Sequence, residues 1–368
     1  MASDGKPWIT ANQVTLARLI PMPFLSWLIY RGGDQGYRDN PYMWAALIAG
    51  ILIGCTDWVD GMLARRYGPT VLGGLLDPIA DKVFIAFAYI PFADLGLVPA
   101  WACGLMFVRE FFVTALRSAY EQRDLTLKTS YIAKAKTWAQ MQGIGVMLLF
   151  PLVDNKPFLI ALLATGTLGP IVAMAVLWFT RKKFWRGALT MSASFAAILA
   201  VYLYDKDYAP HALMLGVVAI TWISGVDYVV VGWRQLRGRG DFSKADAVRI
   251  IGAIAVPSLV FAVLGTVPAW PLFAIMAFEL AVGGLDNLLS HHRKATKALA
   301  WGGRVLGVSA LLALALVLPA YAAPLVYLAA ATSVIGVSAE FWRGRDYYMD
   351  KRIRDKAARA AAATESST

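Results

Sequence analysis

Four aspartates early in the chain have a spacing that suits the transfer of a phosphoryl group. They are Asp57, Asp60, Asp77 and Asp81, in D-W-V-D-G-M-L-A-R and, seven residues later, G-G-L-L-D-P-I-A-D-K. Oxygen ligands suit Mg²⁺ or Mn²⁺, and four acids suffice for two ions about 3.5–4 Å apart. Such a pair of ions can clamp both the attacking and the leaving oxygen of a phosphoryl displacement. Because neighbouring carboxylates repel one another and are costly to desolvate, the spacing predicts positive charge between them.

The residues between these aspartates suit a bound nucleotide. Gly61 and Gly73 leave room for a nucleotide to approach the backbone, and Arg65 can neutralise phosphate. A single aspartate in an apolar segment is often a helix cap or the partner of a cation. Four at these spacings, with two glycines, Ala64 and an arginine among them, favour a catalytic site over those alternatives.

Two antiparallel helices are needed to position the acids. At about 100° per residue, the first two acids share a face of one helix, and the last two lie one turn apart on the next helix. The short turn RRYGPT joins these helices and holds them antiparallel. We therefore expect the four carboxylates to converge near one boundary of a membrane.

The acid-bearing helices belong to a series of apolar stretches that runs along the whole chain. Of the 368 residues, 58% are hydrophobic and only 16% are charged, against roughly a quarter in soluble proteins. Each stretch can cross a hydrocarbon core of about 30 Å as a helix. The composition thus predicts an all-α, polytopic membrane bundle of about twelve spans: 14–31, 42–60, 73–95, 98–118, 137–153, 158–180, 187–204, 210–233, 247–267, 269–289, 299–319 and 322–342.

The loops between these stretches predict an orientation. Lys and Arg gather in alternate loops and in the C-terminal tail, and the opposite loops hold only Arg31, Arg38, Lys156 and Lys206. This asymmetry places both termini and the acids at the cytoplasmic side of an inner membrane. It also accounts for the net charge of +11 through anionic lipid headgroups, without nucleic acid as a partner. The first apolar stretch is full length and no cleavage site follows it, so no signal peptide is expected.

The motif resembles the signature of the CDP-alcohol phosphotransferases, D-x-x-D-G-x-x-A-R, seven residues, G-x-x-x-D-x-x-x-D, at every position. TANQVTLAR, which holds Asn12, Thr15 and Arg18, resembles the family stretch N-x-L-T-x-x-R, with Val14 in place of Leu. Four further segments resemble phosphatidylglycerophosphate synthases in particular: LDPIADK, VREFFVTALR, YIAKAKTWAQ and ITWISGVDYVVVGWRQL. The resemblance covers about 1–153 and 210–236.

This resemblance implies an enzyme and a role for each motif residue. An alcohol would attack the lipid-linked phosphate of CDP-diacylglycerol and expel CMP, and with glycerol 3-phosphate the product is phosphatidylglycerophosphate. Inositol phosphate, serine or phosphatidylglycerol are alternative acceptors. Asp57, Asp60 and Asp77 would bind the metal ions, with Asp81 as the remaining ligand and general base. The CDP moiety would be held by Asp57, Gly61, Ala64, Arg65 and Gly73, with Asn12, Thr15 and Arg18 in support.

A phosphorylated acceptor needs fixed cations of its own. On the side of the acids, a cluster of four is available: Arg109, Arg117, Lys134 and Lys136. Charge inside a span is expensive and usually functional, although Glu110 could simply pair with Arg109. The two lysines could be ordinary positive-inside residues, and Arg18 could snorkel to the interface.

The second half resembles a copy of the first that has lost its acids. KADAVRIIGAIAVPSL aligns with NQVTLARLIPMPFL, which sets Arg249 against Arg18 and Asp286 against Asp57. The other three acids then correspond to Leu289, Leu306 and Ala310, so a second copy could not hold a metal pair. Chance similarity between Leu- and Ala-rich helices is the alternative.

The predicted divisions of the chain follow from these comparisons. They are a catalytic domain over 1–236 with two inserted spans at about 158–204, a linker at 237–246, a four-helix region at 247–342 and a basic tail at 343–368. Because family members are typically homodimers, the second half would pack where another protomer packs, as a monomeric pseudo-dimer; a homodimer is the alternative. His291 and His292 lack a third ligand nearby and are read as loop residues.

Two other classes of protein compete with the enzyme. Twelve spans with a possible repeat are also a common plan of secondary transporters, but those bind substrates near the midplane on broken helices. Here the acids lie in one half and at one end. An inactive scaffold would not need the complete set of four aspartates.

Overall fold

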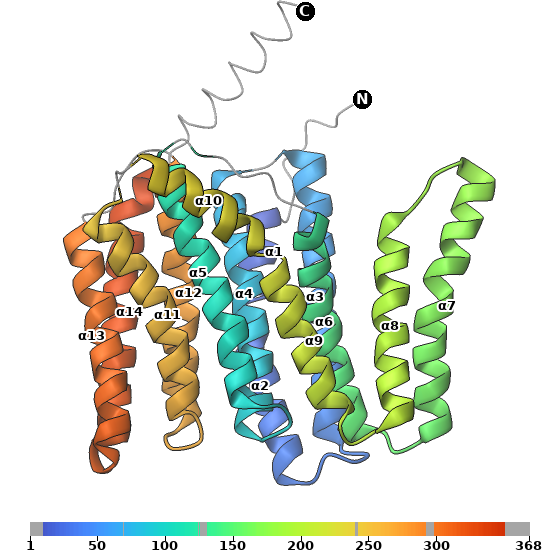
Figure 1. The fold of residues 1–368 in the computed structure, drawn as a ribbon. Coiled ribbons are helices and arrows are strands. Elements are labelled where there is room, and N and C mark those ends of the chain that lie inside the picture. Colours follow the sequence, from blue (N-terminus) through green and yellow to red (C-terminus); the bar gives the residue numbers. More distant parts are fainter. Residues whose placement is uncertain are drawn as a thin grey trace, which may run out of the picture.

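The computed structural model describes residues 10–68, 70–123, 125, 131–239, 242–291 and 298–349, which form a bundle of long helices (Figure 1). The helices in this part of the chain are α1 Ala11–Ala17, α2 Pro21–Asp34, α3 Pro41–Tyr67, α4 Val71–Asp94, α5 Ala100–Glu121, α6 Tyr131–Leu152, α7 Lys156–Arg181, α8 Arg186–Tyr204, α9 Ala209–Ile223, α10 Val226–Arg239, α11 Lys244–Val263, α12 Ala269–His291, α13 Ala298–Val317 and α14 Ala322–Tyr348, with a 3₁₀ turn at Pro319–Tyr321.

The bundle has the features of a multi-pass membrane protein. Seven segments of the described chain are long and apolar enough to cross a membrane: 41–67, 156–181, 187–204, 209–230, 244–263, 269–290 and 319–348. Helices α4 and α5 are of similar length, 24 and 22 residues, but they carry the charged residues of the predicted site. The predicted fold class, a polytopic helical bundle, is confirmed.

The first predicted span is two helices rather than one. Helix α1 begins at a capping box formed by Thr10 and Gln13, and the chain leaves the helix in a turn at 18–20 before α2 starts at Pro21. Proline lacks an N–H, and its ring clashes with the carbonyl four residues earlier, here that of Ala17. At the first position of a new helix the same ring is favourable. The break leaves α1 as a short separate helix beside α3 and α4.

The eighth predicted span is also broken. Helix α9 ends at Ile223 and α10 begins at Val226, with Ser224 and Gly225 in a turn between them. A Cβ on Gly225 would lie 3.0 Å from Nε of Arg109, so the turn packs closely on that side chain. The break therefore coincides with one of the predicted functional residues.

The two halves of the chain share one apolar core. Helix α11 packs along α5, and α12 packs against α4 and α5 (Figure 1). The rings of Phe87 and Phe273 lie 4.8 Å apart between centroids, and those of Phe107 and Phe261 lie 5.6 Å apart and are stacked. Helices α7 and α8 pack mainly on each other at the opposite edge of the bundle.

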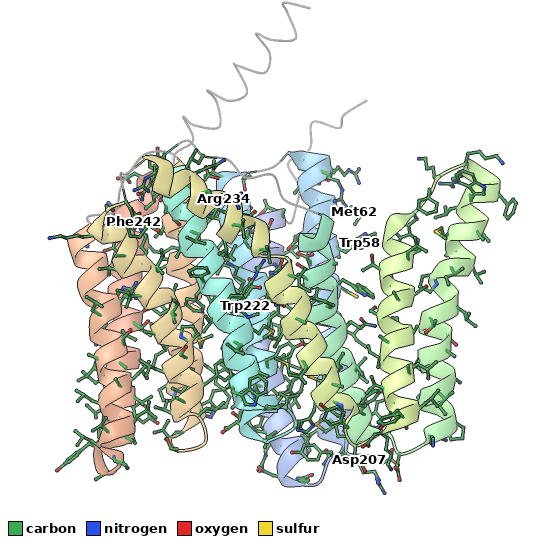
Figure 2. All side chains as sticks on the ribbon, in the orientation of Figure 1. Trp58, Met62, Asp207, Trp222, Arg234 and Phe242 are labelled. Atoms are coloured by element: carbon green, nitrogen blue, oxygen red, sulfur yellow. The ribbon has the colours of Figure 1, made fainter. Side chains whose placement is uncertain are left out.

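The outer surface is apolar between two charged ends. Figure 2 shows Trp58 and Met62 directed outward from α3, and their exposed fractions are 66% and 42%. Arg234 lies toward the upper end of the view and Asp207 at the lower end. The helix ends that carry the predicted basic side, such as the ends of α3 and α7, lie together at the upper end (Figure 1).

Candidate active site

Thr15 on α1 joins one aspartate of α3 to one of α4. Its Oγ1 lies 3.0 Å from Oδ2 of Asp60 and 3.0 Å from Oδ1 of Asp77. A hydroxyl has a single hydrogen to donate, so the two carboxylates share this donor. Thr15 and Asp60 are buried, with 1% and 3% of their surface exposed. The short helix α1 therefore contributes a side chain to the centre of the acid cluster.

Arg18, which directly follows the last residue of α1, supplies the positive charge that the spacing of the acids predicts. Its Nη1 lies 3.0 Å from Oδ1 of Asp57, and its Nη2 lies 3.0 Å from Oδ1 of Asp81. Nη2 also donates to the backbone oxygen of Asp77 at 3.2 Å. The Arg18 side chain is only 3% exposed, so the alternative that it snorkels to the interface is wrong.

The start of α4 is tied to α1. Oγ1 of Thr70 accepts a hydrogen bond from the backbone N–H of Gly73 at 2.9 Å and donates to Oδ1 of Asn12 at 2.8 Å. A Cβ on Gly73 would lie 2.9 Å from that same Asn12 oxygen, which is too close for any larger residue without movement. Glycine at this position thus permits the contact that aligns α1 with α4.

The remaining motif residues lie on the more open face of α3. Asp57 has 53% of its side chain exposed. Gly61 and Ala64 are partly exposed and Arg65 is exposed. A Cβ on Gly61 would lie 3.5 Å from Nη1 of Arg65, so the guanidinium lies beside this glycine. Asp57 and Arg65 therefore present opposite charges to the space beside Gly61.

An apolar groove begins at the acids and runs between α3 and α6. Asp57 and Asp81 line one end, and Leu47 and Leu148 line the other. The ten residues from position 57 back to position 47 correspond to about 15 Å along a helix. Trp138 of α6 lines the groove near the acids. A charged centre thus opens directly into a long apolar channel.

A second apolar groove lies between α1, α2 and α3. Arg18, which contacts two of the acids, lines it together with Pro21, Leu52 and Ile53. Because the two grooves lie on different faces of α3, the acid cluster has apolar space on both sides of that helix.

The predicted cations surround Glu110 in the interior of the bundle. Oε1 of Glu110 lies 2.6 Å from Nζ of Lys136, 3.2 Å from Nε2 of Gln140 and 3.5 Å from Nη1 of Arg109. Nη2 of Arg109 also donates to Oγ of Ser224 in the turn after α9, at 2.8 Å. The proposed Arg109–Glu110 pair exists, but Glu110 is shared with a second cation from α6.

Two further cations extend this group. Nη2 of Arg117 donates to the hydroxyl of Tyr228 at 2.9 Å, and its guanidinium lies 5.3 Å from the centroid of that ring. Nζ of Lys82 donates to Oγ1 of Thr114 at 2.6 Å and is within electrostatic range of Glu110. Sequence reasoning missed Lys82, although its position next to Asp81 in an apolar helix was a signal.

The group as described has an excess of positive charge. Among the described residues, Lys82, Arg109 and Lys136 lie within electrostatic range of Glu110, and Arg117 lies within range of Lys82 and Arg109. The side chain of Lys134 lies outside the described residues. A buried excess of cations favours the binding of an anion. We call these four residues with Glu110 the cationic cluster.

Comparison with known proteins assigns the family. The family model for CDP-alcohol phosphatidyltransferase matches residues 8–180. A Bacillus subtilis protein named CDP-diacylglycerol–glycerol-3-phosphate 3-phosphatidyltransferase is 34% identical over 154 residues, which cover 40% of this chain and 78% of the relative. The chain belongs to the CDP-alcohol phosphatidyltransferase family.

Other members of the family match the same part of the chain. A Mycobacterium tuberculosis protein named probable phosphatidylglycerophosphate synthase is 37% identical over 140 residues, or 38% of this chain. The chain spans 65% of the length of that relative. No solved structure matches the chain. The family match ends at residue 180, so helices α8 to α14 lie outside it.

The acids of this CDP-alcohol phosphatidyltransferase have the donor chemistry of a metal site. Carboxylate oxygens are the preferred ligands of Mg²⁺ and Mn²⁺, and here the guanidinium of Arg18 pairs with two of the four carboxylates and the hydroxyl of Thr15 contacts the other two. Their contacts are with Thr15 and Arg18. Within the described residues, no three His, Cys, Asp or Glu side chains form a group that could hold an ion as they stand. The donor set fits a divalent cation, and its present partners are residues of α1.

Proposed function

We propose that this chain transfers the phosphatidyl group of CDP-diacylglycerol to glycerol 3-phosphate, releasing CMP and phosphatidylglycerophosphate. A hydroxyl oxygen of the acceptor attacks the lipid-linked phosphorus, and the bond from that phosphorus to the CMP oxygen breaks. The hydroxyl proton passes to a base, for which Asp81 is our candidate. The printed names of the family relatives support this reaction.

One observation carries the proposal: an acid cluster with excess negative charge lies at the junction of two apolar grooves. Among the described residues, Arg18 pairs with two of the four carboxylates and Thr15 contacts the other two, and this excess of negative charge suits divalent cations. The grooves on either side of α3 suit the two acyl chains of a diacylglycerol. A lipid carrying a charged nucleotide headgroup needs this combination.

Asp57, Asp60, Asp77 and Asp81 are the residues that would hold two Mg²⁺ or Mn²⁺ ions, which neutralise pyrophosphate charge when bound. Arg65 beside Gly61 supplies a further positive charge for phosphate. The half-buried Asp81 faces the apolar groove, where it would accept the acceptor's proton. Thr15 and Arg18 orient the carboxylates.

The cationic cluster would bind the phosphate of the acceptor. Thr137 and Trp138 line the apolar groove between α3 and α6, and the preceding residue Lys136 contacts Glu110 in the cluster. The two sites therefore meet along α6. Serine carries no phosphate and would leave the excess cations unpaired, so the cluster favours a phosphorylated acceptor.

We also infer the orientation and the state of assembly. The clustering of basic residues at one end of the bundle supports an inner-membrane protein with its site and both termini in the cytoplasm. The packing of α11 and α12 on α4 and α5 supports a monomeric pseudo-dimer in which the second half replaces another protomer. Crosslinking that traps a dimer through α4 and α5 would contradict this assembly.

A reaction with purified protein in detergent tests the function. CDP-diacylglycerol is supplied with a panel of acceptors, and CMP and the lipid product are followed. We expect product with glycerol 3-phosphate and none with serine, and Asp81→Asn should remove CMP release. If another alcohol reacts instead, the acceptor assignment is wrong; flux of a solute across vesicles without CDP-lipid would favour a transporter.

A further inference from the structure

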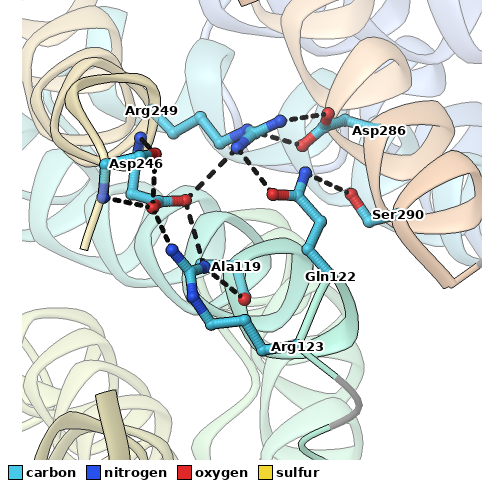
Figure 3. Close-up of polar contacts among 8 residues, drawn as sticks. Ala119, Gln122, Arg123, Asp246, Arg249, Asp286 and Ser290 are labelled. Atoms are coloured by element: carbon cyan, nitrogen blue, oxygen red, sulfur yellow. Dashed lines mark hydrogen bonds and ion pairs between the residues drawn. The ribbon is translucent and has the colours of Figure 1, made fainter. Parts of the chain in front are cut away.

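A buried network of ion pairs joins the end of α5 to the second half of the chain (Figure 3). Nη2 of Arg123 lies 2.6 Å from Oδ2 of Asp246 on α11. Arg249 on the same helix contacts Asp246 at 3.3 Å and Asp286 of α12 at 3.1 Å. The side chain of Gln122 lies between Arg249 and Ser290, as Figure 3 shows. Three helices therefore meet at one charged junction.

Within the described part of the chain, the charges of this junction balance one another. Two arginines face two aspartates, and none of the four side chains is more than 10% exposed. Buried pairs of this kind are costly to break, because removing one partner leaves an unpaired charge. The role of the junction is to fix the three helices relative to one another.

The junction also repeats part of the acid cluster. In the register that aligns the two halves, Arg249 corresponds to Arg18 and Asp286 to Asp57, and both pairs are in contact. Asp246 takes the position of Thr15, three residues before the arginine in each helix. The contact between Arg249 and Asp286 is the one that the duplication predicts, which favours duplication over chance similarity.

Helix α5 connects this junction to the cationic cluster. It carries Arg109 and Arg117 of the cluster, and Arg123 follows just after its end. Along its length it packs against α11, where a Cβ on Gly104 would lie 3.3 Å from Phe261. The position of Arg117 therefore depends on how firmly the end of α5 is held.

We infer that the second half is an intramolecular positioning partner, which holds α5 so that the cationic cluster keeps its geometry for the acceptor phosphate. Arg123, Asp246, Arg249 and Asp286 are then positioning residues, which act through α5. This inference rests on the proposed function where it is tested by KM for glycerol 3-phosphate, but not where it is tested by hydrogen–deuterium exchange.

The test compares two variants of the junction with one matched control. Arg123→Ala and Asp286→Asn break the junction, whereas Ser333→Ala removes a buried hydrogen bond to Glu279 that lies wholly within the second half. We expect the junction variants to raise KM for glycerol 3-phosphate about tenfold, with kcat and KM for CDP-diacylglycerol within about twofold of wild type. The control should lower the thermal midpoint without changing KM.

A second measurement does not depend on the reaction. Hydrogen–deuterium exchange of 117–123 should be faster in both junction variants than in wild type and in the control. Arg123→Lys, which keeps the charge, should restore part of the protection and of KM. Unchanged exchange in the junction variants, or an equal rise of KM in the control, would overturn the inference. If glycerol 3-phosphate is inert with wild type, the proposed function fails and exchange alone decides this inference.

Discussion

The acid cluster of the first half and the junction of the second half contain the same arginine–aspartate contact in different surroundings. Around Arg18, four carboxylates lie close together and two of them pair with the guanidinium; these two, Asp57 and Asp81, have 53% and 31% of their side chains exposed. Around Arg249, two carboxylates face two guanidinium groups, and no side chain exceeds 10% exposure. The first arrangement is open and unbalanced, and the second is closed and balanced.

This difference separates a site from a structural contact. Excess charge of one sign is costly in an apolar bundle, so it persists where a ligand completes it. A balanced, buried group is complete within the chain. Replacing three acids by Leu289, Leu306 and Ala310, while adding Asp246, converts the first pattern into the second.

The largest expected difference between the two regions is in catalysis. Asp81→Asn should lower kcat by about 100- to 10,000-fold, because the candidate general base is lost. Asp286→Asn should leave kcat at saturating acceptor within about twofold of wild type. CMP release measured at saturating lipid and acceptor checks both. A comparable loss of kcat in Asp286→Asn would contradict the division into a site and a structural contact.

The free energy of unfolding should fall more for a substitution in the junction than for one in the acid cluster, the reverse of the order expected for kcat. In chelated protein, Asp286→Asn should lower the free energy of unfolding by about 3 kcal/mol, because Arg249 loses a buried partner. Asp77→Asn removes one charge from an overcrowded acid cluster, so its free energy of unfolding should be unchanged or slightly higher. Thermal unfolding followed by fluorescence compares the stability of the two variants. If Asp77→Asn proved the more destabilising, the acids would be structural.

Divalent cations should stabilise the protein through the acid cluster and not through the second half. Mg²⁺ or Mn²⁺ at 100 times its dissociation constant should stabilise wild type by about 2.7 kcal/mol. The same increment should appear in Glu279→Gln, whose substitution lies outside the acid cluster, and disappear in Asp57→Asn. The thermal midpoint with and without metal is the measurement, and CDP-lipid is left out. An equal increment in Asp57→Asn would place the cation elsewhere.

Most of the acid cluster could be predicted from the spacing of the four aspartates in the sequence. Two helices joined by a short turn can bring residues at these intervals together, and the structure links Asp57 and Asp60 of α3 to Asp77 and Asp81 of α4 through residues of α1. The metal role of these acids stays a prediction. The break at Pro21 was also readable, because proline seldom continues a helix, but the apolar stretch was taken as one span.

Other parts of the site depend on tertiary packing that no local pattern states. The turn at Ser224 is set by its contact with Arg109, more than a hundred residues away in sequence. From the sequence alone, Lys82 looks like a residue at the membrane boundary. In the structure, α5 places Thr114 beside its ammonium group. The division of the chain at residues 236 and 247 likewise stays a prediction, because both halves share one core.

The cationic cluster gives a smaller effect, confined to the acceptor. Arg117→Ala should raise KM for glycerol 3-phosphate by about tenfold to a hundredfold, because one charge-assisted contact with phosphate is lost. Its control is Arg234→Ala, an exposed arginine of α10, which should leave KM unchanged. Steady-state kinetics with varied acceptor measure both. A rise in KM for the lipid donor instead would assign Arg117 to the nucleotide.

The smallest expected effect isolates the orientation of Arg117 from its charge. Tyr228→Phe removes the hydroxyl that accepts from Nη2 of Arg117 at 2.9 Å but keeps the ring 5.3 Å from the guanidinium. Loss of one hydrogen bond of about 1 kcal/mol should raise KM for the acceptor about fivefold and leave kcat unchanged. The backbone oxygen of Tyr228 still accepts from Tyr120, so the turn after α9 should keep its place. If Tyr228→Phe matched Arg117→Ala in size, the hydroxyl itself would have to contact the acceptor, and Tyr228 would join the acceptor site rather than support it.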